Sequence, residues 1–361
     1  MNLFSRRDFM LASAGLSIAG SSLAQSTKSR VQKAQSERNS EINEEALFNT
    51  GSSNLVHPLP YNPSAGLHKD RGLLICGSGD YMLAWTIGYF YALHQSGVDL
   101  SSAEIIVGTS AGAIAGSAIA TGHLTHLIAE LNFFTDMPLL LAELSANAKL
   151  NASQKRALQL CLAVKEAKTA SIQAIGRSAM AAHTTTPTHY EVTLKRLLGK
   201  RNWPADKVYV TTNDCYTGER LVISHSDNIP IEQACAASFA WPGLKSPVWL
   251  DDRACMDGSI SETSTHADIL VGAKRVLVIS LNDGTEQSLK QGLSLSSLPS
   301  TLLKDIDNLK QTGSQTLLIS AGLPPGKSSV DLLDSKLVGQ GLTYGFVRGI
   351  AGASQIKQFW A

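Results

Sequence analysis

The 361-residue chain has little net charge, few aromatic residues and no closely spaced cysteine pair. Lys and Arg number 31 and Asp and Glu number 30, so the formal net charge is +1. A protein that binds nucleic acid mainly through the phosphates needs a basic surplus, and this chain has none. We therefore expect no nucleic-acid partner.

Long hydrophobic runs are missing as well. No window of the sequence reaches the ~18–20 unbroken apolar residues that a membrane-spanning helix needs. Hydrophobic residues nevertheless make up 43% of the chain and charged residues 17%, which excludes a disordered protein and provides for a large core. At ~100–200 residues per domain, the length fits one large domain or two ordinary ones.

Cysteine is scarce, and its spacing forms no metal or redox motif. The five residues are Cys76, Cys161, Cys215, Cys235 and Cys255. No CxxC pair occurs, so we expect neither a zinc site nor a thioredoxin-like motif and interpret the cysteines as small buried residues. His123 and His126 lie three apart on an expected helix, but no carboxylate or Cys partner for a metal is evident. We therefore expect no metal and no organic cofactor.

The amino terminus resembles a twin-arginine export signal. Arg6 and Arg7 precede a mildly apolar run over residues 11–20, and Ser22 and Ala24 supply the small residues of a cleavage site. Such a signal would direct the folded protein to the periplasm or out of the cell and would be removed after Ala24. The alternative is a disordered basic start with one short helix.

Composition divides the chain into three parts. Residues 1–24 form the expected signal, the polar residues 25–66 form a linker, and residues 67–361 form the folded domain. Within that domain, continuous apolar runs such as 71–76 and 275–280 alternate with helical patterns. Runs of this kind indicate an α/β fold whose mostly parallel sheet is covered on both faces.

The segment from about 123 to 187 is expected to be a helical insertion, because it carries no strand signal. An apolar cluster lies just inside it and comprises Phe133, Phe134, Met137, Pro138, Leu139, Leu140 and Leu141. The cluster has two interpretations: a lid or lipid-facing surface that contacts a membrane, or a cap over the core beside the site. The tail from Leu293 onward is expected to be mostly helical.

A serine turn is the first feature that points to chemistry. Gly108-Thr-Ser-Ala-Gly112 lies between an expected buried strand, 104–107, and an expected helix, 111–120. A serine on such a turn presents its hydroxyl as a nucleophile, and the glycines avoid clashes with strand and helix. The helix amino terminus adds N–H groups and positive dipole. Ser110 is therefore a candidate nucleophile; the alternative is a glycine turn with a helix-capping serine.

A serine nucleophile needs a base, and Asp257 offers a carboxylate at an expected strand end, followed by Gly258. The glycine lets another backbone segment approach closely. A triad is the alternative, because Ser110, Asp257 and His266 follow the chain order of α/β-hydrolases. His266 comes only nine residues after the acid, which is a short gap for that fold.

The two motifs and their surroundings resemble those of the patatin-like phospholipases. The match runs from about Gly72 to Ser280. It includes the loop Gly77-Ser78-Gly79, the serine turn, Ala236-Ala-Ser-Phe-Ala-Trp-Pro-Gly243 and Met256-Asp-Gly258. The resemblance implies a three-layer α/β/α fold with a mostly parallel central sheet and a helical insertion.

The resemblance also implies a serine acyl hydrolase with a Ser–Asp dyad, acting on a lipid or another acyl ester without a cofactor. Ser110 would be the acyl-accepting nucleophile, and Asp257 would take its proton. Burial beside an acyl chain would make that Asp a better base. The other implied site residues are Gly77, Ser78 and Gly79 as oxyanion donors, and Gly108, Gly112 and Gly258 as the motif glycines.

The chain departs from the family pattern at the glycine loop. The family usually has three glycines with a basic residue soon after, whereas this chain has Ser78 in the middle and Asp80 next. A carboxylate here would oppose the oxyanion unless it turns outward, pairs with a cation or stays protonated. We expect Asp80 to turn outward and cap the helix expected over 82–95. The alternative functions are a catalytically impaired lipid-binding or interaction protein and an esterase for small soluble substrates.

Overall fold

The computed structural model describes residues 65–136, 150–184, 187–198, 202–204, 207–290, 298–324, 327 and 337–361. These residues all belong to one unit of the chain, within 49–361. The expected signal, and the expected linker except for its last two residues, lie outside the described residues. So does the apolar cluster at 133–141, of which only the helical backbone up to Asp136 is described.

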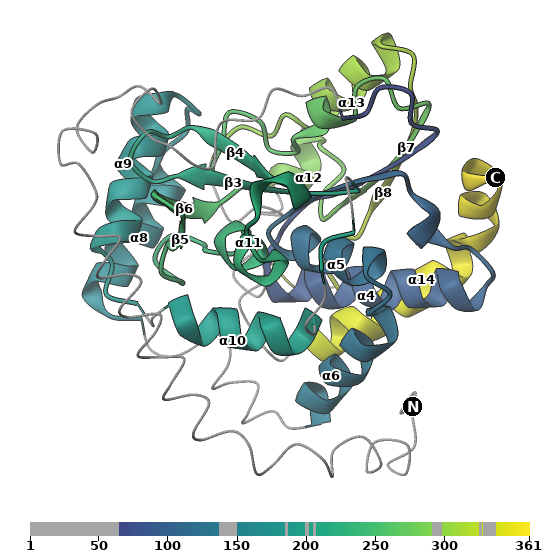
Figure 1. Cartoon of the computed structure of the whole chain (residues 1–361), viewed down its shortest axis with the longest axis horizontal. Coiled ribbons are helices and arrows are strands. Elements are labelled where there is room, and N and C mark those ends of the chain that lie inside the picture. The colour runs from purple at the N-terminus through teal and green to yellow at the C-terminus, as the bar shows by residue number, and fades with distance from the viewer. Residues whose placement is uncertain are drawn as a thin grey trace. The chain divides into compact units, whose positions relative to one another are not determined.

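An eight-stranded sheet runs through the described unit (Figure 1). The strands are β1 (Arg71–Ile75), β2 (Ile105–Thr109), β3 (Val208–Asp214), β4 (Arg220–Ile223), β5 (Val248–Leu250), β6 (Arg253–Asp257), β7 (Arg275–Ser280) and β8 (Gln315–Ser320). Their order is β5-β6-β3-β2-β1-β7-β8, and β4 pairs with β3. The run from β3 to β8 is parallel throughout, whereas β4 and β6 pair antiparallel with β3. The expectation of a mostly parallel sheet is confirmed.

Helices surround the sheet. They are α4 (Gly79–Gln95), α5 (Ala111–Ala120), α6 (Leu124–Asp136), α8 (Ala152–Ala163), α9 (Thr169–Ala181), α10 (Pro187–Leu198), α11 (Ile231–Ser238), α12 (Glu286–Lys290), α13 (Leu302–Gln311) and α14 (Leu337–Trp360), with the short 3-10 helices η2 (Leu100–Ser102), η3 (His225–Asp227) and η4 (Ala267–Leu270). Among the described helices, none combines the length and the apolarity that crossing a bilayer requires.

Both faces of the sheet are buried, as the continuous apolar runs predict. Successive strand residues point to opposite faces. Leu73 and Ile75 of β1 pack in one core with α4, α5 and α14, whereas Leu74 packs in a second core with η4 and α13. The result is the expected three-layer α/β/α arrangement. All five cysteines are buried free thiols, which confirms their interpretation as small core residues.

Helix α14 fixes the position of α4, whose first turn borders the candidate site. The backbones of the two helices nearly touch at two glycines. A Cβ atom at Gly345 would lie 2.0 Å from the carbonyl oxygen of Trp85, and one at Gly88 would lie 2.1 Å from that of Leu342. No side chain fits at either glycine, so the two helices pack backbone to backbone in the core on one face of the sheet.

The described part of the tail is mostly helical, as expected, but it also contains the strand β8, which was not predicted. This strand pairs in parallel with β7 at the edge of the sheet, and its residues are only partly buried. Its sequence, Gln-Thr-Leu-Leu-Ile-Ser, holds three consecutive apolar residues. So short a run cannot be assigned to strand or helix from periodicity alone.

Candidate active site

Ser110 occupies a sharp turn between β2 and α5. Its φ is 55° and its ψ is −122°, a conformation that costs a residue with a side chain ~1–3 kcal/mol. The structure also explains the flanking glycines. A Cβ atom at Gly108 would lie 2.6 Å from the Cα of Ala113, and one at Gly112 would lie 2.0 Å from the carbonyl oxygen of Ile75. Strand, turn and helix pack too closely at these two positions for any side chain.

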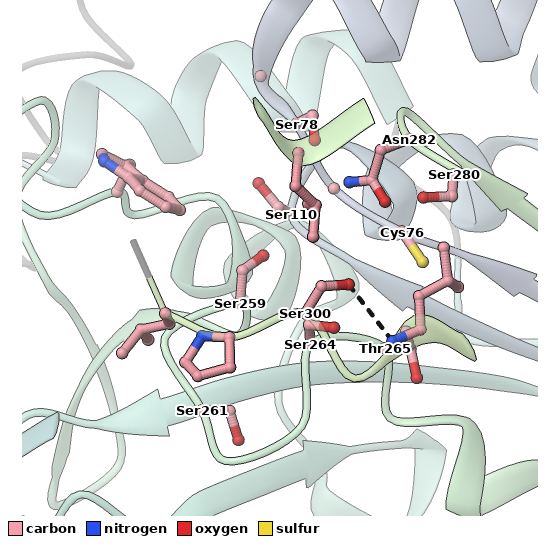
Figure 2. A pocket seen from close by; sticks show the side chains of 17 residues that line it. Cys76, Ser78, Ser110, Ser259, Ser261, Ser264, Thr265, Ser280, Asn282 and Ser300 are labelled. Carbon is pink, nitrogen blue, oxygen red and sulfur yellow. Dashed lines mark hydrogen bonds between the residues drawn. The ribbon is translucent and has the colours of Figure 1, made fainter. Parts of the chain in front are cut away.

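The glycine loop after β1 lies directly against Ser110. A Cβ atom at Gly77 would come within 2.5 Å of the Ser110 Cβ and 3.2 Å of its Oγ. Gly77, Ser78, Gly79 and Ser110 line one pocket (Figure 2). Helix α4 begins at Gly79 and α5 at Ala111, and the first N–H groups of a helix have no acceptor inside it. An anionic oxygen beside Ser110 therefore lies near the positive ends of two helices.

Asp257 ends β6 at the same end of the sheet as Ser110. Thr211 of β3 pairs with Thr109 of β2, and Thr212 pairs with Asp257. The two candidate residues therefore flank β3 on opposite sides. Behind Asp257, a Cβ atom at Gly258 would lie 2.5 Å from the carbonyl oxygen of Thr211, so the glycine permits the close approach expected of it.

The environment of Asp257 makes it a stronger base than an ordinary carboxylate. The residue is completely buried. Burial raises its pKa from 3.8 to about 6, and interaction with the Ser110 hydroxyl is the largest opposing influence. One carboxylate oxygen accepts the Ser259 N–H at 2.9 Å. The other oxygen, Oδ2, is buried and has no hydrogen-bond partner among the described residues. Catalytic hydrogen bonds are often loose before substrate binds.

Ser238 is a site residue whose role the sequence did not reveal. Its Oγ accepts the N–H of Ser110 at 2.7 Å, which holds the strained turn in place. Two residues later, the carbonyl oxygen of Ala240 accepts the N–H of Asp257 at 3.0 Å. The last residue of α11 and the segment that follows it thus hold both candidate residues. The sequence of this segment contributes to the family resemblance. The contact itself could not be predicted from spacing, because Ser110 and Ser238 are more than a hundred positions apart.

His266 makes no hydrogen bond to the Asp257 carboxylate in the described structure. Its Nε2 is 2.9 Å from the carbonyl oxygen of Gly258. Burial lowers the pKa of His266 from 6.5 to about 4, so the ring is neutral at pH 7 and Nε2–H donates to that oxygen. This geometry favours a supporting role for His266 in the turn after β6 over a place in a triad.

The histidine pair considered for metal binding lies at the start of α6. The rings of His123 and His126 are 5.3 Å apart, edge to face. Within the described ranges, no group of three or more His, Cys, Asp or Glu side chains is arranged to hold a metal ion.

Asp80 does not cap α4, so that expectation was wrong. The helix begins at Gly79, three residues before the predicted start, because the glycine adopts a φ of 72° and lets the helix start directly from the loop. Asp80 therefore lies inside the first turn, and Ser78 precedes the helix without a side-chain cap. The half-buried Asp80 carboxylate acts on the ammonium of Lys245. Of the three ways to tolerate this charge, the structure favours a nearby cation.

The pocket around Ser110 combines hydroxyl groups with apolar side chains (Figure 2). Besides the glycine loop and Ser110, its lining comprises Cys76, Trp241, Ser259, Ser261, Ser264, Thr265, Ser280, Asn282, Leu289, Leu298, Pro299, Ser300 and Leu302. The described lining includes no Lys, Arg, Asp or Glu. The described lining thus mixes uncharged polar groups with apolar side chains.

Comparison with known families and structures gives the following matches. The family model of the patatin-like phospholipases matches residues 76–269, more than half of the chain. No curated protein matches the chain significantly by sequence. Similar solved structures include VipD from Legionella pneumophila, at 13% identity and a TM-score of 0.37, with 86% of this chain and 73% of VipD covered.

Two further solved structures are longer proteins. The type III effector ExoU of Pseudomonas aeruginosa matches at 17% identity and a TM-score of 0.29, with 81% of this chain and 54% of ExoU covered. Human group IVD cytosolic phospholipase A2, in complex with methyl γ-linolenyl fluorophosphonate, matches at 14% identity and a TM-score of 0.37, with 83% and 59% covered. The chain therefore spans less than two thirds of either protein.

Proposed function

The chain belongs to the patatin-like phospholipase family, and on that premise we propose that it is a serine lipid acyl hydrolase, a carboxylic ester hydrolase of the phospholipase A type. One arrangement supports the proposal above all others. The strained Ser110 has the Gly77 backbone against one side, and the buried Asp257 ends the strand on the other side of β3 at the same end of the sheet. A structural glycine turn needs no such carboxylate.

In the proposed mechanism, the Ser110 Oγ attacks the ester carbonyl carbon while Asp257 takes the hydroxyl proton. With a pKa of about 6, the carboxylate is mostly ionised at pH 7 yet accepts a proton more readily than an ordinary Asp. The carbonyl oxygen becomes an oxyanion facing the N–H groups of the Gly77–Gly79 loop and the start of α5. Collapse of this intermediate expels the alcohol, which takes the proton from Asp257, and leaves an acyl-enzyme. Water then attacks the acyl group and gives a proton to Asp257. Collapse of this second intermediate breaks the bond to the Ser110 Oγ, which takes the proton back from Asp257, and the acid is released.

The pocket supports an amphiphilic substrate. Hydroxyl groups such as those of Ser259 and Ser261 suit the polar end of a glycerol ester, while Trp241, Leu298 and Leu302 suit the acyl chain. We infer that the substrate is a lipid presented at a membrane or micelle surface. We propose the apolar cluster at 133–141 as a point of membrane contact, and the alternative is that it caps the core beside the site.

A catalytically impaired lipid-binding protein is the second candidate, and Asp80 is the observation that favours it. Its carboxylate follows the glycine loop directly, where negative charge opposes an oxyanion. An impaired protein would bind lipid without turning it over, and a serine-directed reagent would not label Ser110.

Acyl release from a panel of lipids tests the proposal. The panel comprises phospholipids, a triacylglycerol and short-chain soluble esters, each tested below and above its aggregation limit. We expect hydrolysis that rises when substrate aggregates and that falls ~10⁴–10⁶-fold in Ser110→Ala. His266→Ala is the matched control and should stay within about tenfold of the wild type, since it removes a neutral supporting ring. More than a tenth of the activity left in Ser110→Ala would exclude the proposed nucleophile, and an inactive but folded His266→Ala would favour the triad.

We also propose that residues 1–24 are a twin-arginine signal and that the protein acts in the periplasm or outside the cell. The proposal rests on Arg6 and Arg7 ahead of a weakly apolar run. Residues 25–66 would then be a linker between the cleavage site and the folded domain.

A further inference from the structure

Lys245 is an unusual residue for its surroundings. Lysine is almost never fully buried unless it is paired, yet only 8% of the Lys245 surface is exposed. Its N–H donates to the carbonyl oxygen of Trp241 at 3.0 Å, which closes a tight turn. Its Nζ lies 3.7 Å from the centre of the Phe239 ring, a cation–π contact. Backbone and ring together fix where the ammonium sits.

The turn that carries Lys245 directly follows the two residues that hold the candidate dyad. Ser238, at the end of α11, binds the Ser110 N–H, and Ala240 binds the Asp257 N–H. Lys245 closes the turn that begins at Trp241, one residue after Ala240. A charge fixed in this segment acts on the site at short range and with little screening by solvent.

Two acidic groups of the described residues act electrostatically on the ammonium from different elements. Asp80 lies in the first turn of α4, directly after the glycine loop Gly77–Gly79, and Asp257 lies at the end of β6. Burial lowers the pKa of Lys245 from 10.5 to about 7, and both carboxylates oppose that shift. In turn, the ammonium helps to lower the pKa of Asp257.

We propose that Lys245 is a positioning residue that compensates the charge of Asp80 beside the oxyanion loop and keeps Asp257 in its basic form. This inference rests on the proposed function. Without a nearby cation, the Asp80 carboxylate would raise the energy of a second negative charge on the substrate oxygen. With the ammonium present, the site tolerates the residue that departs most from the family pattern.

Two ionisations then govern the rate. Asp257 must be ionised, which requires a pH above about 6, and Lys245 must be protonated, which requires a pH below about 7. Turnover should therefore follow a narrow bell between these values. Removing the ammonium should raise the pKa of Asp257 and move the acid limb to higher pH.

Profiles of kcat against pH for Lys245→Met, Asp80→Asn and the double variant test the proposal. Lys245→Met should lose about tenfold or more in kcat with little change in KM, because the charge acts on the transition state. Adding Asp80→Asn should recover most of that loss, since it removes the charge that Lys245 offsets. The proposal would be overturned if the double variant were as slow as Lys245→Met. It would also be overturned if the acid limb of the kcat profile of Lys245→Met lay at the same pH as that of the wild type. The exposed Lys168→Met serves as the control.

A measurement that needs no hydrolysis separates this inference from the proposed function. The ¹³Cε signal of Lys245, assigned by its loss in Lys245→Met, is titrated by NMR in the full chain. We expect a midpoint near 7 that falls by about half a pH unit or more in Asp80→Asn. A midpoint unaffected by Asp80→Asn overturns this inference alone. If the Lys245 midpoint falls in Asp80→Asn as expected but the wild-type protein hydrolyses no ester, the proposed function is overturned and the charge compensation is supported.

Discussion

Replacing Asp257 by Asn should stabilise the folded protein while abolishing hydrolysis. Asp257 is completely buried, and desolvation raises its pKa from 3.8 to about 6. Keeping the carboxylate charged in the folded state therefore costs free energy that the unfolded chain does not spend. Asn is neutral, and its side-chain oxygen can still accept the Ser259 N–H. Asp257→Asn should therefore lose the catalytic base and also the free-energy cost of a buried charge in the folded state.

The size of the effect follows from the pKa shift. A difference of about 2 pH units corresponds to ~3 kcal/mol, at ~1.4 kcal/mol per unit. Because the folded pKa is raised, the cost is complete above about 6, where the Asp is charged in both states, and vanishes below 3.8, where it is protonated in both. We therefore expect Asp257→Asn to be ~3 kcal/mol more stable than the wild type at pH 8 and roughly half as much at pH 5.

Urea unfolding of the full chain at pH 8 and pH 5 measures both values. Asp307→Asn is a matched control because its carboxylate is exposed and pairs only with Lys310 of the same helix among the described contacts. The control should show a gain of less than ~0.5 kcal/mol at either pH. Equal stability of Asp257→Asn and the wild type at pH 8, or a gain that does not depend on pH, would refute the assignment of Asp257 as a strained buried base.

Three other changes test the surroundings of the site and the export signal. Gly77→Ala should lower kcat by ~10²-fold or more, because the new methyl group meets Ser110 at 2.5 Å; a variant with wild-type kinetics would contradict the close loop. Ser238→Ala should cost ~1–3 kcal/mol in urea unfolding, since it leaves the buried N–H of the serine turn without its acceptor; unchanged stability would exclude that role. Replacing both Arg6 and Arg7 by Lys should retain the precursor in the cytoplasm on cell fractionation, and equal export of this variant would contradict the proposed signal.

The central part of the fold could be predicted because its signals are local. Continuous apolar runs mark β1, β2 and β7 as strands buried on both faces, and the structure has them in the parallel run of the sheet. The serine turn was also predictable, because the glycines around Ser110 indicate close backbone packing, which the structure confirms. Each of these features can be predicted from a few consecutive residues.

The remaining features depend on contacts between distant segments. Nothing local to Ser238 shows that its hydroxyl holds the N–H of Ser110. Asp80 was misplaced because a helix that starts at Gly79 needs a backbone conformation that the sequence does not specify. Lys245 gave no signal, since its importance comes from lying near two carboxylates of other elements.

Labelling by a long-chain fluorophosphonate, followed by mass mapping of the modified peptide, tests the central claim most directly. The reagent reacts with a serine only where a base and oxyanion donors activate it. We predict one modified residue, Ser110, with no label in Ser110→Ala and labelling at least ~10²-fold slower in Asp257→Asn. A folded wild-type protein that stays unlabelled, or that carries the label on another serine, would contradict the Ser110–Asp257 dyad.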